Sequence, residues 1–273
     1  MNPWLETLGA LLFATTGALF GKWFAQLSGR RWLFGYMLAF FPMIVIAASR
    51  HIYSLPFLPP FSWMLSGRIP FALAGFSIAL LLSVLLHRTP KKRDRFCLWA
   101  LLVTSVGAFS IPVFLGPAID HKLLLSLQTT IDSDGVCRQN TGFTCGPAAA
   151  VTALRQFGIA GDESELAILA HTSSFTGTPP IILAKTIQNK YSDRGFIAEF
   201  QTFESIQQLG KAGVTIALVK FGFLVDHYVT VLKVTDEKVI VGDPYLGKTE
   251  MTHQEFRNIW RFAGVHLSRR TYP

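Results

Sequence analysis

A single cysteine stands where a helix is expected to begin, in the segment QNTGFTCGPAAAVTALRQFGI at residues 139–159. A thiol attacks a carbonyl carbon efficiently only as the thiolate, and an unperturbed cysteine, with a pKa of about 8.5, is mostly protonated at neutral pH. Thr144 and Pro147 favour a helix start beside Cys145, where the positive end of the helix dipole would favour the thiolate. Taken alone, such a cysteine is more often a packed apolar residue.

A nucleophilic thiolate needs a histidine partner, which forms an ion pair with it and later protonates the leaving amine. Among the seven histidines, His227 begins the strand-like segment HYVTVLKV, and the next such segment, KVIVGDPYLG, contains Asp243. A turn at residues 235–237 would bring Asp243 within a few positions of His227, where its carboxylate could hold the imidazole tautomer. Gln139 could donate its amide to an oxyanion. The predicted catalytic residues are therefore Cys145, His227, Asp243 and Gln139.

The pattern of apolar residues along the chain predicts the helices and strands that must position these residues. Helical signals come first, with Asp162 as a cap of the second helix and Gly158 closing the first, and strand signals follow. Helices followed by an antiparallel sheet predict an α+β domain. The predicted helices cover residues 145–158, 162–172 and 180–191, and the predicted strands cover residues 214–221, 227–234 and 238–244.

The N-terminal part of the chain has a different character. Half of the chain is hydrophobic and only 15% is charged, which is too apolar for an ordinary soluble protein. Four apolar runs, at residues 3–24, 32–49, 69–86 and 97–116, predict four transmembrane helices. The first run could instead be a signal peptide, but no basic segment precedes it. We therefore expect a membrane region at residues 1–116, an amphipathic linker at 117–134 and a soluble domain at 135–273.

Charge predicts how these helices are oriented. Residues 1–116 contain ten Lys or Arg against two acidic residues, whereas the remainder contains 15 of each. Basic residues confined to loops between apolar runs indicate lipid headgroups and topology, and argue against nucleic acid as a partner. Eight of them lie in the first and third loops. The positive-inside rule then predicts a multi-pass protein of the cytoplasmic (inner) membrane, with the N-terminus and the soluble domain outside the cytoplasm.

The segments QNTGFTCGPAAAVTAL, DHYVTVLKV and VIVGDPYLG together resemble the bacteriocin-processing peptidases of cysteine peptidase family 39, which remove leader peptides after a double glycine. The family pattern has a glutamine six residues before a Cys-Gly pair, a histidine opening an apolar strand, and an Asp-Pro followed by a glycine. The matching positions are Gln139, Cys145, Gly146, His227, Asp243, Pro244 and Gly247, and the resemblance covers residues 135–262.

This resemblance implies a papain-like fold and cysteine peptidase activity. It implies Cys145 as nucleophile, His227 as general base and acid, Asp243 as the residue that orients the histidine, and Gln139 as oxyanion donor. No cofactor or metal is expected. The expected partners are a peptide or protein substrate, the lipid bilayer and a separate exporter. Well-known members work in the cytoplasm at the N-terminus of an ATP-driven exporter, so the predicted outside location leaves double-glycine specificity open.

Several alternatives stay open. Cys137, eight residues before Cys145, could form a disulfide with it or contribute with it and His227 to a zinc site. Phe256 and Trp260 are expected in the core, with the substrate cleft as the alternative. The domain could bind peptides for an exporter without cleaving them, it could regulate a four-helix transporter, or the same site could perform another acyl transfer.

Overall fold

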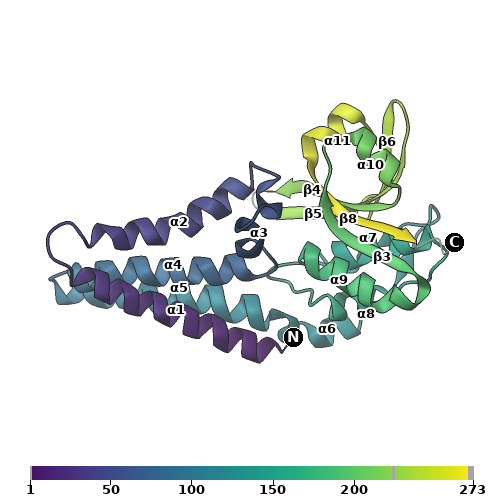
Figure 1. Cartoon of the computed structure of the whole chain (residues 1–273). Coiled ribbons are helices and arrows are strands. Elements are labelled where there is room, and N and C mark those ends of the chain that lie inside the picture. Colours follow the sequence, from purple (N-terminus) through teal and green to yellow (C-terminus); the bar gives the residue numbers. More distant parts are fainter. Residues whose placement is uncertain (1, 223–224, 270–273) are drawn as a thin grey trace. The chain divides into compact units, whose positions relative to one another are not determined.

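The structure of the chain is a computed structural model that describes residues 2–222 and 225–269. The chain divides into two compact units, Met1–Ile119 and Asp120–Pro273 (Figure 1). The first unit is helical, whereas the second combines helices with β-sheet. A helical region followed by an antiparallel sheet with helices was the predicted fold class, and it is confirmed.

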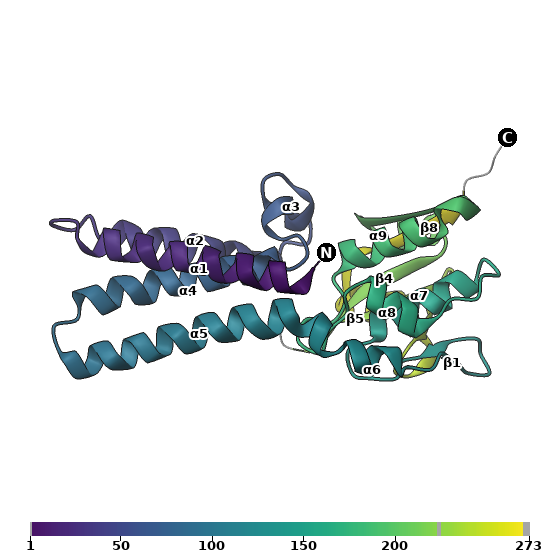
Figure 2. The same cartoon turned by 90° about the horizontal axis from the view of Figure 1, so that it is seen from below.

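The first unit consists of helices that run side by side (Figures 1 and 2). Among the described residues, three helical stretches are long and apolar enough to cross a membrane, namely Pro3–Ala25, Ile69–Arg88 and Lys92–Leu125, and residues 92–119 of the last belong to this unit. The fourth apolar helix, α2, has 17 residues and is shorter than these. The presence of four transmembrane helices therefore stays a prediction. The elements of this unit are α1 (Pro3–Ala25), α2 (Leu33–Ser49), η1 (Leu55–Phe57), α3 (Phe61–Met64), α4 (Ile69–Arg88) and α5 (Lys92–Ile119).

Helix α1 packs against α4 through small residues. A Cβ atom on Gly17 would lie 2.5 Å from the Phe76 carbonyl oxygen, and one on Gly21 would lie 2.4 Å from the Leu80 carbonyl oxygen. The large apolar side chains of α1 are instead exposed, as at Leu5, Leu12 and Trp23. Small residues between helices and large apolar residues facing outward are typical of helices surrounded by lipid. This arrangement supports membrane association of the first unit.

The second unit is built on a six-stranded antiparallel sheet with the strand order β3-β8-β4-β5-β6-β7. Its elements are α6 (His121–Leu125), β1 (Thr130–Ile131), β2 (Cys137–Arg138), α7 (Cys145–Arg155), α8 (Glu163–Leu169), α9 (Pro180–Tyr191), η2 (Ser192–Arg194), β3 (Phe196–Thr202), α10 (Ile206–Ala212), β4 (Thr215–Gly222), β5 (Val225–Val234), β6 (Lys238–Asp243), β7 (Gly247–Thr252), α11 (His253–Ile259) and β8 (Trp260–Arg269).

The three predicted helices are α7, α8 and α9, and the three predicted strands are β4, β5 and β6. Strands β3, β7 and β8 were not predicted. The domain limits also differ from the expected ones. The unit boundary lies after Ile119, and the segment expected as a linker contributes α6 and β1 to the second unit. Leu124 of α6 is buried there, and its carbonyl accepts a hydrogen bond from the Ser164 hydroxyl. The last four residues of the expected domain, 270–273, lie outside the described part of the chain.

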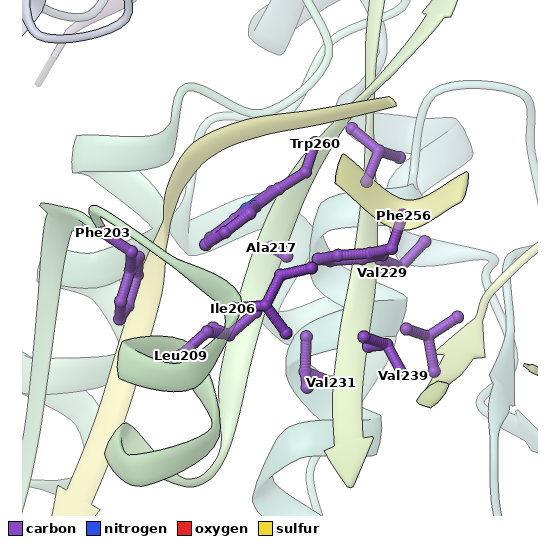
Figure 3. Close-up of a cluster of buried hydrophobic side chains, with 11 residues drawn as sticks. Phe203, Ile206, Leu209, Ala217, Val229, Val231, Val239, Phe256 and Trp260 are labelled. Atoms are coloured by element: carbon purple, nitrogen blue, oxygen red, sulfur yellow. The ribbon is translucent and has the colours of Figure 1, made fainter. Parts of the chain in front are cut away.

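The two faces of the sheet are covered by different helices. On β5, the Thr230 hydroxyl donates to the Ala149 carbonyl of α7 at 2.7 Å, whereas Val229 and Val231 belong to an apolar cluster formed with α10 and α11 (Figure 3). Because neighbouring residues of a strand point to opposite faces, α7 covers one face and the cluster covers the other. The cluster contains Phe203, Ile206, Leu209, Ala217, Val219, Val229, Val231, Val239, Val241, Phe256 and Trp260.

The core role expected for Phe256 and Trp260 is confirmed, because both side chains are fully buried in this cluster. Their alternative placement, along a substrate cleft, is wrong. The indole N–H of Trp260 donates to the Ala263 carbonyl, so the one polar atom of this side chain is paired within the core.

The close contact between α1 and α4 leads to a stability prediction. Replacing Gly21 by leucine should destabilise the protein by about 1–3 kcal/mol, because the added side chain meets the α4 backbone and the helices must separate. The thermal unfolding midpoint of the full chain in detergent measures this effect. Gly9→Leu is the matched control on the same helix, since no atom lies within 4 Å of its added Cβ. Equal midpoints for the two variants would contradict the packing described above.

Candidate active site

Cys145 is the first residue of α7, a helix that is buried over almost its whole length. Its side chain is buried, with 8% of the residue surface exposed. The first helical hydrogen bond runs from the Ala148 N–H to the Thr144 carbonyl, and Pro147 has no N–H group. The start of α7 therefore presents the N–H groups of Cys145 and Gly146, which have no partner within the helix.

Thr144 precedes α7 as its N-cap residue, but its hydroxyl makes no capping hydrogen bond. This differs from the expected side-chain cap. The physical reason is a competing partner, because the Thr144 hydroxyl donates to the Thr141 carbonyl at 3.4 Å and accepts the Thr141 backbone N–H at 3.2 Å. Thr144 also lies near Glu163, which begins α8 and is fully buried, and partly offsets the rise in its pKa. The start of the helix that carries Cys145 is thus next to a neighbouring helix.

Gly146 allows the close approach of a second segment to the start of α7. A Cβ atom at Gly146 would lie 2.9 Å from the Cβ of Thr178 and 3.4 Å from the ring of Tyr228. The Tyr228 hydroxyl donates to the Thr178 carbonyl at 2.6 Å, inside the protein. Any larger residue after Cys145 would push these groups apart, so the Cys-Gly pair is a packing requirement of the site as well as a motif.

His227 and Asp243 form a buried hydrogen-bonded pair. The Nε2 atom of His227 donates to Oδ1 of Asp243 at 2.8 Å, and each residue is only 6% exposed. Because a histidine ring has two nitrogens, this bond leaves Nδ1 for another partner. Cys145 lies close enough to His227 to raise the pKa of the ring. The structure thus brings Cys145, His227 and Asp243 together in one site.

This arrangement changes the pKa values of both ionisable partners of the thiol. Burial lowers the pKa of His227, but its hydrogen bond to Asp243, the nearby Cys145 and the negative charges of both raise it by more, to about 9. Burial raises the pKa of Asp243, but the hydrogen bond and charge of His227 and two backbone N–H groups lower it below its usual range. Both shifts favour a charged imidazolium next to a charged carboxylate at neutral pH.

The pairing of β5 with β6 is irregular at one position. Val231 pairs with Val241 and Thr230 with Gly242, but the register shifts by one residue between Val231 and Lys233. On the site side of this irregularity, the pairing brings the end of β6 beside the start of β5. Asp243 and His227 meet there through their hydrogen bond.

The turn after Asp243 is held by the same carboxylate that binds His227. Oδ1 of Asp243 accepts the backbone N–H of Tyr245 at 2.7 Å and that of Leu246 at 3.3 Å. Gly247 has φ +89°, a conformation that residues with a side chain rarely adopt. These contacts explain the Asp-Pro and the following glycine in physical terms. They hold the Asp243 carboxylate in place independently of its hydrogen bond to His227.

Gln139 lies in the loop that leads into α7. Its backbone N–H donates to the Pro244 carbonyl at 3.0 Å, which ties this loop to the residue after Asp243. Its side-chain Nε2 donates to the Thr141 carbonyl at 2.9 Å, while Oε1 is buried and has no partner among the described residues. The amide nitrogen carries two hydrogens, so one remains for another acceptor. Its predicted contact with an oxyanion stays a prediction.

The two thiols of this unit are both free, so the alternative of a disulfide between Cys137 and Cys145 is not realised in the structure. Cys137 is fully buried, and its burial together with the negative charge of Glu163 raises its pKa to about 12. This thiol is therefore protonated at neutral pH and is not a second nucleophile. Among the described residues, no group of three or more His, Cys, Asp or Glu could hold a metal ion.

Two features of the site were not predicted from the sequence. One is Glu163, which the sequence places only in the first turn of a helix. The other is an exposed aromatic pair beside the histidine, because the Phe221 ring lies 5.3 Å from the His227 ring and 6.4 Å from the Tyr245 ring. Neither follows from local periodicity, since both depend on contacts between segments far apart in the chain.

Comparisons with known proteins agree on the second half of the chain. An uncharacterised protein of Methanothermobacter marburgensis is 32% identical over 138 residues, which are 50% of this chain and 90% of that protein. An uncharacterised protein of Methanothermobacter thermautotrophicus is 26% identical over 134 residues, 49% of this chain and 88% of that protein.

Two solved structures are also similar. The peptidase domain of Streptococcus ComA, a bifunctional ABC transporter of a quorum-sensing pathway, has a TM-score of 0.44 and 21% identity, covering 49% of this chain and 96% of that domain. A double-glycine motif protease from an AMS/PCAT transporter, solved with its leader peptide, has a TM-score of 0.43 and 17% identity, covering 53% of this chain and 96% of that protease.

The family profile described as "Peptidase C39 family" matches residues 134–271, which is half of the chain and contains every residue of the site described above. The family resemblance inferred from the sequence is thereby confirmed. This chain belongs to the peptidase C39 family of cysteine peptidases.

Proposed function

We propose that this protein is a membrane-anchored cysteine peptidase that processes exported peptides or proteins. In this proposal Cys145 is the nucleophile, His227 the general base and acid, Asp243 the residue that orients the histidine, and Gln139 an oxyanion donor. The observation that carries the proposal is the buried hydrogen-bonded pair of His227 and Asp243, with Cys145 next to the His227 ring. Membership in the peptidase C39 family supports the same chemistry.

The first half of the reaction forms an acyl-enzyme. The Cys145 thiolate attacks the carbonyl carbon of the peptide bond, and the carbonyl oxygen becomes an oxyanion. The Gln139 amide and the N–H groups at the start of α7 are the donors assigned to this oxyanion, and such donors stabilise the developing charge. His227 then gives its proton to the amide nitrogen, the C–N bond breaks, and the amine leaves while a thioester remains on Cys145.

The second half of the reaction hydrolyses the thioester. His227, now neutral, takes a proton from water, and the resulting hydroxide adds to the thioester carbonyl. Collapse of this intermediate breaks the C–S bond, releases the carboxylic acid product and restores the thiolate beside the protonated histidine. Asp243 remains ionised throughout, because its lowered pKa keeps the carboxylate charged and able to hold Nε2–H of His227.

The role of Cys145 is tested by labelling with a thiol-directed peptide electrophile. Cys145→Ala should abolish the label and stop cleavage of any substrate, because Cys145 is the thiol next to the His227 ring. Mass spectrometry of the labelled full-length protein locates the modified residue.

Cys137→Ala is the matched control for this experiment. Its thiol is fully buried and protonated at neutral pH, so the variant should label as fast as the natural protein. Labelling that persists in Cys145→Ala would exclude the proposed nucleophile. A natural protein that does not label would instead favour a domain that binds peptides without cleaving them.

The charge state of His227 provides an independent test. Because its folded-state pKa is about 9, the ring should stay protonated at neutral pH and lose its proton only as the pH rises through about 9. In Asp243→Asn the carboxylate charge is gone, so this loss should occur at lower pH. Nuclear magnetic resonance of the full chain labelled with ¹³C-histidine follows the titration, and His227→Gln assigns the signal.

His266 is an internal control for this titration. Burial lowers its pKa, against smaller opposing effects from Glu199 and a backbone hydrogen bond, so its ring should become neutral below the usual pH for histidine. Its signal should not respond to Asp243→Asn. An unchanged His227 titration in Asp243→Asn would show that this carboxylate does not hold the ring in its charged form.

We further propose that the peptidase unit lies outside the cytoplasm and meets its substrates at the outer face of the cytoplasmic membrane. The junction of α4 and α5 supports this orientation. Residues 88–95, which comprise the end of α4, the connecting loop and the start of α5, contain five basic residues, and such basic segments are retained in the cytoplasm. Helix α5 then leads outward to Asp120, where the second unit begins. The basic residues are Arg88, Lys91, Lys92, Arg93 and Arg95.

Reporter fusions test this orientation. Alkaline phosphatase, which is active only outside the cytoplasm, should be active when it follows the C-terminus and inactive when it is inserted at Pro90, in the loop between α4 and α5. Green fluorescent protein at the same two positions should give the reverse pattern. Phosphatase activity at Pro90 would contradict the orientation and would place the peptidase unit in the cytoplasm.

A further inference from the structure

Glu163 is a buried carboxylate that the proposed chemistry does not use. It is the first residue of α8 and has no exposed surface. A carboxylate in this position loses its hydration, and such a loss is tolerated only where hydrogen bonds replace the water. Where these hydrogen bonds go therefore indicates what the residue does.

All side-chain partners of Glu163 come from the short loop between Gln139 and Cys145. Oε1 accepts the Asn140 backbone N–H at 3.1 Å, and Oε2 accepts the Asn140 side-chain amide at 2.6 Å. Burial raises the pKa of Glu163, and the neighbouring Thr144 hydroxyl and the Asn140 donors lower it in part. The carboxylate thus holds the loop at Asn140, the residue after Gln139, and lies near Thr144, the residue before Cys145.

The backbone of Glu163 is held by the segment that follows α6. The Glu163 backbone N–H donates to the Thr129 hydroxyl at 2.8 Å, and that hydroxyl donates to Asp162 at 3.0 Å. Asn140 is fixed on its other side, because its amide also donates to the Gln128 carbonyl at 2.7 Å. The loop is therefore clamped between the start of α8 and the segment after α6.

The orientation of the Gln139 amide depends on this loop. Its Nε2 donates to the Thr141 carbonyl, which lies between Asn140 and Thr144. The Thr141 backbone N–H in turn donates to the Thr144 hydroxyl at 3.2 Å. Moving the loop would move the carbonyl that directs the amide. The direction of the second amide hydrogen would change with it.

We propose that Glu163 is a positioning residue that fixes the Gln139–Thr144 loop, so that the Gln139 amide reaches the oxyanion formed at Cys145. This role rests on the proposed function. It requires a carboxylate and not only a polar side chain. A glutamine at position 163 has one acceptor oxygen, and its amide would face a donor of Asn140, leaving that donor unpaired.

Two probes of Cys145 separate this role from a general effect on the fold. The first probe is the aldehyde acetyl-glycyl-glycinal. The Cys145 thiolate adds to its carbonyl carbon, and the oxygen of the resulting thiohemiacetal occupies the position of the oxyanion. Iodoacetamide alkylates the thiolate: a C–S bond forms at its CH₂ carbon as iodide leaves, so no oxyanion forms. Both probes are applied to the full chain in detergent, with the folded fraction measured by thermal unfolding.

Glu163→Gln should weaken binding of the aldehyde by about tenfold or more, a loss of the size seen when an oxyanion donor is impaired. The rate of alkylation by iodoacetamide should stay within about twofold of that of the natural protein. The double variant Gln139→Ala with Glu163→Gln should bind the aldehyde no more weakly than Gln139→Ala alone, because Glu163 acts through Gln139.

Glu165→Gln is the matched control. This carboxylate lies on the same helix as Glu163, and its described side-chain partner is Lys190, outside the Gln139–Thr144 loop. Both probes should behave as in the natural protein. Asn140→Ala is a second variant that leaves the buried carboxylate in place and removes a side chain at the surface, and it should show the same selective loss as Glu163→Gln.

The outcomes distinguish the two proposals. Equal losses for both probes in Glu163→Gln and Asn140→Ala, or normal aldehyde binding in both, would overturn the positioning role while leaving the nucleophile intact. A natural protein that neither binds the aldehyde nor is alkylated at Cys145 would overturn the proposed function and this role with it. A selective loss of aldehyde binding in both variants supports the role of Glu163.

Discussion

The hydrogen bond between His227 and Asp243 is the contact on which the site depends. Both side chains are almost fully buried, and neither charge would be stable there alone, because desolvation disfavours each charged form. Together they reverse the effect of burial, so that the pKa of His227 rises to about 9 and that of Asp243 falls. The Asp243 carboxylate is fixed further by two backbone N–H groups of its own turn. The histidine is thus oriented by a group that cannot itself move.

The sheet has to bring these two side chains together, and the pairing of β5 with β6 does so although its register shifts by one residue in β5. The apolar positions of β5 show the same shift. Val229 and Val231 alternate regularly in the cluster (Figure 3), but the next residue of this strand that packs against the cluster is Val234. Hydrophobic packing on the α10 and α11 side therefore holds this shift in place. The catalytic geometry is stabilised by a core that contains no catalytic residue.

Much of this could be predicted from the sequence, and the remainder could not, for identifiable reasons. The hairpin of β5 and β6 has strong alternation and a short polar turn, so the approach of Asp243 to His227 followed from local signals. Strand β8 pairs with both β3 and β4, and its Gly264 is explained by the close approach of β4, where the Ile216 carbonyl would lie 2.7 Å from an added Cβ atom. Thr144 was a possible side-chain cap of α7, but its hydroxyl bonds to Thr141 within the preceding loop instead.

The two buried carboxylates beside the thiol are held in different electrostatic environments, and their surroundings account for the difference. Asp243 faces a histidine that becomes positively charged, so its pKa is lowered, whereas Glu163 is surrounded by neutral donors and its pKa is raised. They meet through one segment, because the Gln139 N–H bonds to the Pro244 carbonyl next to Asp243, and Asn140 bonds to Glu163. The charged Asp243 carboxylate orients His227, and the neutral donors around Glu163 hold the loop that leads into α7. The thiol of Cys145 lies where these two constraints join, so its surroundings are determined from both sides by groups that are themselves fixed.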